Sequence, residues 1–148
     1  MLALEQQLVI SINLLLATLL SAVIGLDREQ SHHPAGLRTH MLIGLGSALF
    51  TTLSLFAFPS DDNSRIASNI VVGVGFLGAG AIIRSGERQV VGMTTAAGIW
   101  VVAAIGMACG SGNYLLAIVT TFFAWLILSV LGRIKDSATA KEAKNGTS

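Results

Sequence analysis

The side chains best suited to chemistry are the charged residues that interrupt long apolar stretches. Asp27 and Arg28 come directly after one apolar run, Arg38 stands just before the next, and Arg84 follows a third. A carboxylate at the edge of the hydrocarbon needs a cation beside it. We therefore expect an Asp27–Arg38 or Asp27–Arg84 ion pair at the cytoplasmic end of a helix bundle, which we call its inner mouth. The alternative is ordinary interface charges whose long arginine side chains reach toward water.

Two neighbouring hydroxyl side chains, Thr94 and Thr95, stand at the start of a further apolar stretch, just after Gly92. A threonine can cap the first turn of a helix. The N-terminus of a helix close to arginines can also bind an anion or a partner. The sequence leaves capping and binding open as the role of these threonines.

The chain offers little for metal binding or catalysis. His32 and His33 adjoin, with His40 further on, and neither a cysteine nor a spaced acid joins them in a ligand pattern. Asp61 and Asp62 could hold a hydrated Mg²⁺ only loosely, and helix capping is the simpler explanation of this pair. A Ser–His, paired-Asp or metalloprotease arrangement at membrane depth is missing. We expect no enzyme, no metal site, no cofactor and no nucleic-acid partner.

Glycines are concentrated in one apolar stretch, at Gly73, Gly75, Gly78 and Gly80. The first three match the dinucleotide-binding fingerprint letter by letter. They lie inside an apolar span rather than between a strand and a helix, and no acid follows about 20 residues on. Small residues let membrane helices approach closely, so we predict helix packing at these positions. A broken helix that lines an ion or ligand site is the alternative.

Five apolar stretches of about membrane-spanning length must position these residues. A helix needs about 20 residues to cross about 30 Å of hydrocarbon. Lipid gives the backbone no hydrogen-bond partner, and the stretches lack the alternation of barrel strands. The fold class is therefore an all-α membrane protein with a bundle of five transmembrane helices. Within the spans, Asn13 and Asn69 are candidates for interhelical hydrogen bonds. The predicted spans are Leu8–Leu26, Met41–Phe58, Ile66–Ile83, Met93–Cys109 and Tyr114–Leu131.

The distribution of positive charge predicts the orientation of this bundle. Eight of the nine Lys and Arg residues fall on one side of the predicted zigzag, and Arg65 is the exception. By the positive-inside rule, the N-terminus is periplasmic and the C-terminus cytoplasmic. We expect one transmembrane domain, residues 1–132, and a short charged tail, residues 133–148, that is disordered. A bundle this small has little interior for a pathway, so we also expect a homodimer or a higher homo-oligomer.

Taken together and in order, these motifs resemble the MgtC/SapB family of bacterial inner-membrane proteins. The resemblance runs from about Leu14 to Leu131. The motifs that carry it are Gly25-Leu-Asp27-Arg28-Glu29, Pro34-Ala-Gly-Leu-Arg38-Thr39, Arg65-Ile-Ala, Gly73-Val-Gly-Phe-Leu-Gly-Ala-Gly80, and Gly92-Met-Thr-Thr-Ala-Ala with Trp100 and Cys109-Gly110.

The resemblance implies a multi-pass protein of the bacterial inner membrane that regulates other membrane proteins and is not an enzyme. Such proteins are linked to low-magnesium adaptation, virulence and stress survival, and the ATP synthase and transporters are among their implied partners. The best-known member has a soluble C-terminal domain after the bundle, so we expect the function of that domain to be absent or supplied elsewhere. That member also has Asn where this chain has Thr94. An ion transporter or channel subunit is the alternative, based on Asp27, Arg38 and Arg84.

Overall fold

The computed structural model describes residues 3–57, 64–85 and 89–131 of the chain. This part folds into five helices and one small β-hairpin. The four helices α1 to α4 are long and apolar enough to cross a membrane, and α5 is a shorter apolar helix. The prediction of an all-helical, multi-pass membrane protein is confirmed. In chain order the elements are α1 (Leu4–Gln30), α2 (Leu37–Phe56), α3 (Ser64–Ala81), β1 (Ile83–Ser85), β2 (Gln89–Val91), α4 (Met93–Gly110), α5 (Tyr114–Trp125) and the π-helical segment η1 (Leu126–Leu131).

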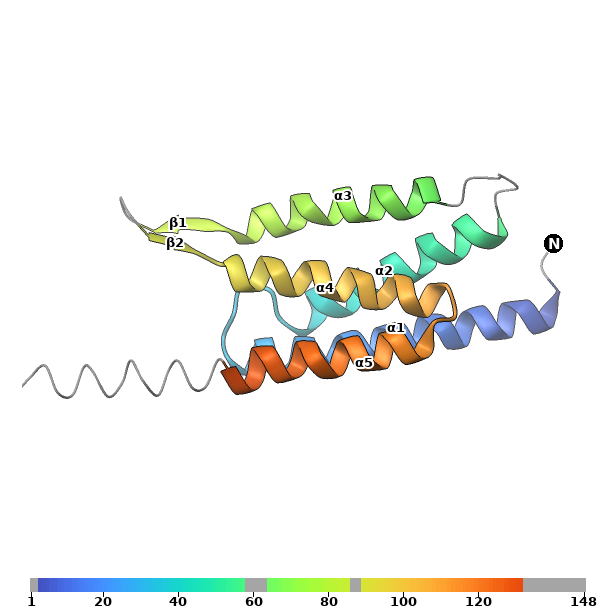
Figure 1. Cartoon of the computed structure of the whole chain (residues 1–148), viewed down its shortest axis with the longest axis horizontal. Coiled ribbons are helices and arrows are strands. Elements are labelled where there is room, and N and C mark those ends of the chain that lie inside the picture. Colours follow the sequence, from blue (N-terminus) through green and yellow to red (C-terminus); the bar gives the residue numbers. More distant parts are fainter. Residues whose placement is uncertain (1–2, 58–63, 86–88, 132–148) are drawn as a thin grey trace, which may run out of the picture.

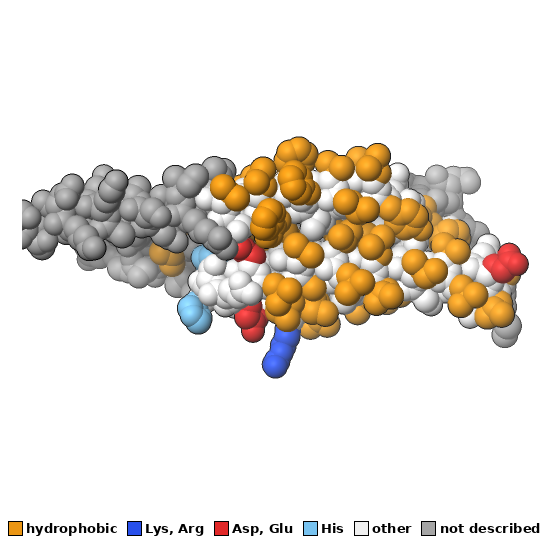
Figure 2. Space-filling view, turned by 90° about the horizontal axis from the view of Figure 1, so that it is seen from below, with side chains coloured by type: hydrophobic (Ala, Val, Ile, Leu, Met, Phe, Trp, Pro, Cys, Tyr) orange, Lys and Arg blue, Asp and Glu red, His pale blue; other side chains and the backbone are white. Residues whose placement is uncertain are grey.

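The helices lie side by side along the long axis of the molecule (Figure 1). Helix α4 is central: α3 packs on one side of it, and α1, α2 and α5 also contact it. One end of the bundle carries β1 and β2, the α1–α2 connection and the end of α5; we call it the hairpin end. Figure 2 shows a broad apolar surface along the middle of the bundle, with charged and histidine side chains toward the ends. Such a surface suits contact with lipid.

Several predicted boundaries need correction: α1 begins at Leu4 and α2 at Leu37, each four residues before its predicted start. The ends of α1 and α3 differ as well. Helix α1 runs to Gln30, so Asp27 lies in its last turn rather than in a loop after it. A basic residue is favourable at the negative end of a helix, and Arg28 supplies it. Helix α3 ends at Ala81, before the predicted end at Ile83, because Ile83–Ser85 pairs in antiparallel register with Gln89–Val91. The segments β1 and β2 between α3 and α4 form a β-hairpin, and the predicted tail 133–148 lies outside the described residues.

Glycines bring α1, α2 and α4 into close contact. A Cβ atom built on Gly44 would overlap the hydroxyl of Ser21, and one built on Gly106 would overlap the carbonyl oxygen of Gly44. A Cβ on Gly110 would likewise overlap the carbonyl oxygen of Ala48. Backbones this close gain dispersion contacts that larger side chains would prevent. The tightest helix packing within the chain therefore uses glycines outside the glycine-rich third span.

The glycine-rich helix α3 is the least buried of the four candidate spans. A Cβ on Gly78 would lie 3.6 Å from the Cβ of Ala96, so this glycine packs against α4. The positions Gly73, Gly75 and Gly80 have nothing within 4 Å of an added Cβ. Packing of these three glycines between chains stays a prediction. The helix is continuous from Ser64 to Ala81, so the alternative of a broken third span is wrong.

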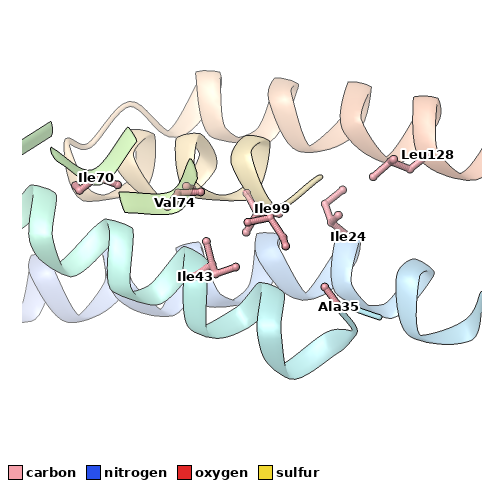
Figure 3. Packing of buried hydrophobic residues seen from close by; sticks show 9 residues of the cluster. Ile24, Ala35, Ile43, Ile70, Val74, Ile99 and Leu128 are labelled. Carbon is pink, nitrogen blue, oxygen red and sulfur yellow. The ribbon is translucent and has the colours of Figure 1, made fainter. Parts of the chain in front are cut away.

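A buried apolar cluster joins the helices toward the hairpin end. Ile24 of α1, Ile43 of α2 and Ile99 of α4 belong to this cluster, together with Ile70 of α3 and Leu128 of η1 (Figure 3). The cluster draws on every helix of the described chain, because α5 continues directly into η1.

Substitution of Gly106 by Ala should separate α4 from α2, because the new methyl group meets a backbone carbonyl that cannot rotate away. We expect Gly106→Ala to lower the free energy of unfolding by about 1–3 kcal/mol. The matched control on the same helix is Gly98→Ala, whose Cβ meets its nearest atom at an ordinary 3.7 Å. Tryptophan fluorescence during unfolding in mixed micelles measures both. Equal stability of the two variants would contradict the close packing described here.

Candidate functional site

Among the described residues, two side chains that can carry a positive charge are buried at the hairpin end. Arg28 of α1 is 4% exposed and His40 of α2 is not exposed at all. Arginine is almost never fully buried unless it is paired. The partners of these two residues therefore define the candidate site.

Arg28 pairs with its neighbour in the sequence. Its guanidinium contacts Oδ2 of Asp27 through Nη2 and, at 3.1 Å, through Nε. Among the described side chains this pair replaces the predicted Asp27–Arg38 ion pair. Arg38 lies in the first turn of α2 and is exposed. The side chain of Arg84, the other predicted partner, lies outside the described residues.

The same guanidinium also reaches the end of the last helix. Nη2 of Arg28 donates a hydrogen bond to the carbonyl oxygen of Leu128 at 3.0 Å. Leu128 lies in η1, the π-helical segment that continues α5. Arg28 therefore joins α1 to η1, and Asp27 neutralises the buried charge that makes this contact.

Glu29 is a functional residue of the fold that the sequence analysis missed. Its carboxylate accepts a hydrogen bond of 2.6 Å from the backbone N–H of Leu37, the first residue of α2. The N-cap of α2 is Gly36, which has no side chain for capping, and a Cβ there would overlap the Glu29 carboxylate. A carboxylate at a helix N-terminus is favourable. Gly36 has no side chain that could cap α2, and Glu29 precedes it by seven residues. An acid this close before a helix that starts after glycine is the signal that could have revealed the cap.

His40, which the sequence analysis considered only as a possible metal ligand together with His32 and His33, is wholly buried. Its Nδ1 lies 2.8 Å from the carbonyl oxygen of Gly36. A carbonyl only accepts, so Nδ1 carries the hydrogen, and in the neutral ring Nε2 keeps a lone pair. Nε2 has no hydrogen-bond partner among the described protein atoms. The ring thus presents one unused acceptor toward Gly98 of α4, where an added Cβ would lie 3.7 Å away.

The two candidate threonines, Thr94 and Thr95, lie in different environments, and neither caps α4. The N-cap residue is Gly92, which adopts a left-handed φ of 93° and makes no side-chain cap. Its lack of a side chain is required, because a Cβ would overlap the carbonyl oxygen of Ala81. Thr95 is buried and Thr94 is exposed. The capping prediction for these threonines is therefore wrong, and a binding role stays a prediction.

One predicted interhelical hydrogen bond is present at the opposite end of the bundle. The hydroxyl of Tyr114 donates to Oδ1 of Asn13 at 2.7 Å and ties α5 to α1. Asn69 is exposed on α3 and lines a groove between α2 and α3. Within residues 3–57, 64–85 and 89–131, no three His, Cys, Asp or Glu side chains gather as a metal site. The acids Asp61 and Asp62 lie outside the described residues.

Comparison with known proteins places these features in a family. The sequence model of the MgtC family matches residues 14–137. YhiD of Escherichia coli K12, named "Putative magnesium transporter YhiD", is 46% identical over 131 residues, which cover 83% of this chain and 60% of that protein. SrpB of Synechococcus elongatus is 41% identical over 148 residues, covering 90% and 81%. MgtC of Salmonella typhimurium is 46% identical over 110 residues, covering 74% and 47%.

The chain spans less than two thirds of the length of YhiD and about half that of MgtC. No solved structure matches it significantly. The matched region nevertheless includes Arg28, Glu29 and His40, so the residues that make the polar contacts of the hairpin end lie inside the shared segment.

Removal of the Arg28 guanidinium should destabilise the bundle strongly. Arg28→Leu leaves the Asp27 carboxylate and the Leu128 carbonyl without their partner, and we expect a loss of about 3–5 kcal/mol in the free energy of unfolding. The double variant Asp27→Asn/Arg28→Leu should lose less than the sum of its single variants. Arg38→Leu, on an exposed side chain, is the control and should stay within about 0.5 kcal/mol of the unmodified chain. Additive effects of Asp27 and Arg28 in unfolding measurements would show that the pair is not coupled.

Proposed function

Because this chain belongs to the MgtC family, we propose that it is a non-enzymatic regulator of the bacterial inner membrane. In this proposal it binds other membrane proteins, the ATP synthase or transporters among them, during adaptation to low magnesium, stress or virulence. Proteins of the family are not known as enzymes. The printed name of YhiD refers to magnesium transport and supports the magnesium link at the level of the family.

The contrast between two sets of glycines is the observation that carries this proposal. Gly44 and Gly106 close the interface between α1, α2 and α4, which leaves no room for an ion between these helices at that level. Gly73 and Gly80 instead face open space on α3. Lipid gains nothing from an exposed glycine, whereas a neighbouring helix can approach closely there. The open face of α3 therefore favours helix–helix binding over transport through one chain.

A groove beside this face adds to the support. It has a volume of about 690 Å³ and lies between α2 and α3, with Gly46, Phe50, Gly73 and Leu77 among its lining residues. The polar side chain of Asn69 also lines it. Amide side chains hydrogen-bond between membrane helices, so an Asn at this position suits a partner helix better than lipid tails.

An ion transporter or channel subunit remains the second candidate. The name of YhiD favours it, as does the buried Asp27–Arg28 pair, because ionisable residues at membrane depth often mark ion pathways. In this structure the pair already has a structural partner in the Leu128 carbonyl. A transport role would need residues other than this satisfied pair to move the ion.

Substitution on the open face of α3 should weaken partner binding about tenfold without unfolding the chain. In Gly73→Leu/Gly80→Leu, two large side chains cover the face where nothing lies within 4 Å. We expect capture of partner membrane proteins from native membranes in mild detergent to fall about tenfold, equivalent to about 1.4 kcal/mol. Val119→Leu, on an exposed position of α5, is the control and should keep full capture. Retained capture in the glycine variant, or Mg²⁺ flux in liposomes holding only this chain, would favour transport instead.

We also propose that the chain forms a homo-oligomer, most simply a two-fold dimer. Crosslinking in native bilayers through a cysteine at Val72, an exposed position of α3, should then yield a dimer. The internal thiol Cys109 is buried and should not contribute. Monomer alone, at every crosslinker length tried, would overturn this proposal.

A further inference from the structure

We propose that the end of the bundle opposite the hairpin end binds one diacyl phospholipid whose head group ends in a primary amine. The site is a crevice between residues 5–13 of α1, residues 55–56 of α2 and residues 110–114 of the α4–α5 turn, and we call it the head-group crevice. In this site Glu5 pairs with the ammonium group, and the amide of Asn13 donates a hydrogen bond to an ester carbonyl. The lipid site is independent of the proposed partner binding, because none of its residues lies on α3.

The amide of Asn13 offers an unused hydrogen-bond donor to the head-group crevice. Its side chain is 4% exposed, and its Oδ1 accepts the hydrogen bond of Tyr114. Its Nδ2 donates to none of the described residues. Unlike Nε2 of His40, this nitrogen is not fully enclosed, and Asn13 itself lines the crevice. A buried donor without an acceptor is unfavourable, so a ligand that brings an acceptor oxygen to Nδ2 gains from that contact.

At the outer end of the same crevice, Glu5 supplies a negative charge. It lies exposed in the first turn of α1, and no cation of the described residues pairs with it. Glu5 is the only charged residue among those described residues that line the crevice. The charge of the site therefore favours a ligand with a cationic group. Beside it, Gln6 accepts the backbone N–H of Ala3 through Oε1, which leaves its amide hydrogens to donate to an anionic oxygen.

The spacing of these polar groups selects an elongated ligand. Glu5 and Asn13 are eight residues apart, so they share one face of α1 and lie about 12 Å apart along its axis. A ligand that reaches both residues carries its cation and its acceptor at separate places. In a diacyl phospholipid with an aminoethyl head group, the ammonium, the phosphate and the ester carbonyls follow one another in the order of Glu5, Gln6 and Asn13.

The size and the open side of the crevice suit the polar part of such a lipid. Its volume is about 360 Å³, within the range of about 300–1,000 Å³ typical of small-molecule sites. Val9 of α1 and Phe56 of α2 line the crevice and are exposed, so it opens outward on one side. The head group and glycerol therefore occupy the crevice, while the acyl chains extend over the apolar surface along the middle of the bundle.

Three phospholipids with the same acyl-chain length test the two contacts separately. Diacyl phosphatidylethanolamine carries both groups, its diether analogue lacks the carbonyls, and diacyl phosphatidylcholine lacks the N–H donors. Native mass spectrometry of the full chain in mild detergent measures the binding of each lipid over a concentration series. We expect diacyl phosphatidylethanolamine to bind at least about tenfold more tightly than either of the others. Equal binding of either analogue, or no saturable binding of the phosphatidylethanolamine, would overturn the proposal.

Two variants assign each preference to its residue. Glu5→Ala should remove the preference for the primary amine over the choline head group and keep the preference for the diester over the diether. Asn13→Leu should remove the diester preference and keep the amine preference, which also shows that the crevice still forms. Ser11→Ala, on an exposed position of α1 outside the crevice, is the control and should keep both preferences.

A variant that keeps the preference assigned to its residue would place the lipid elsewhere and overturn the proposal. If Asn13→Leu does not fold, the three lipids on the unmodified chain and the Glu5→Ala variant still decide the outcome, because Glu5 is exposed and its replacement leaves the packing of the helices intact.

Discussion

The buried guanidinium of Arg28 is the interaction on which the hairpin end depends. It is held by Asp27 and in turn holds the carbonyl oxygen of Leu128, while the next residue, Glu29, caps the start of α2. Three consecutive residues in the last turn of α1 therefore fix two other helices. Because charge and backbone groups at this depth have few other partners, each contact supports the next.

The placement of the helices could be predicted well from the sequence, because length and hydropathy report directly on crossing a membrane. The ends of α1 and α3 could not. The extension of α1 to Gln30 depends on partners that Arg28 and Glu29 find on distant segments. The early end of α3 depends on pairing between Ile83–Ser85 and Gln89–Val91. The mean hydropathy of a run of consecutive residues contains no information on either interaction.

The candidate site was harder to predict than the fold, because it depends on how each helix is rotated. The pattern of Gly73, Gly75, Gly78 and Gly80 indicated packing, yet Gly78 is the member of this set that meets another helix in the described chain. The isolated glycines 44 and 106 form the tight contact instead. Likewise, the sequence analysis singled out Asp27 and Arg28 as charged residues, but it did not anticipate their pairing with each other.

The structure separates a closely packed part from an open part, and this separation bears on function. Helices α1, α2 and α4 pack through glycine contacts that tolerate no added atoms, so relative movement of these helices would be costly. Helix α3 is held mainly by α4 and exposes glycines outward. A rigid body that presents one lightly held helix is suited to binding another membrane protein, because contact with that helix need not disturb the rest. An alternating-access transporter would instead require the closely packed interface itself to open.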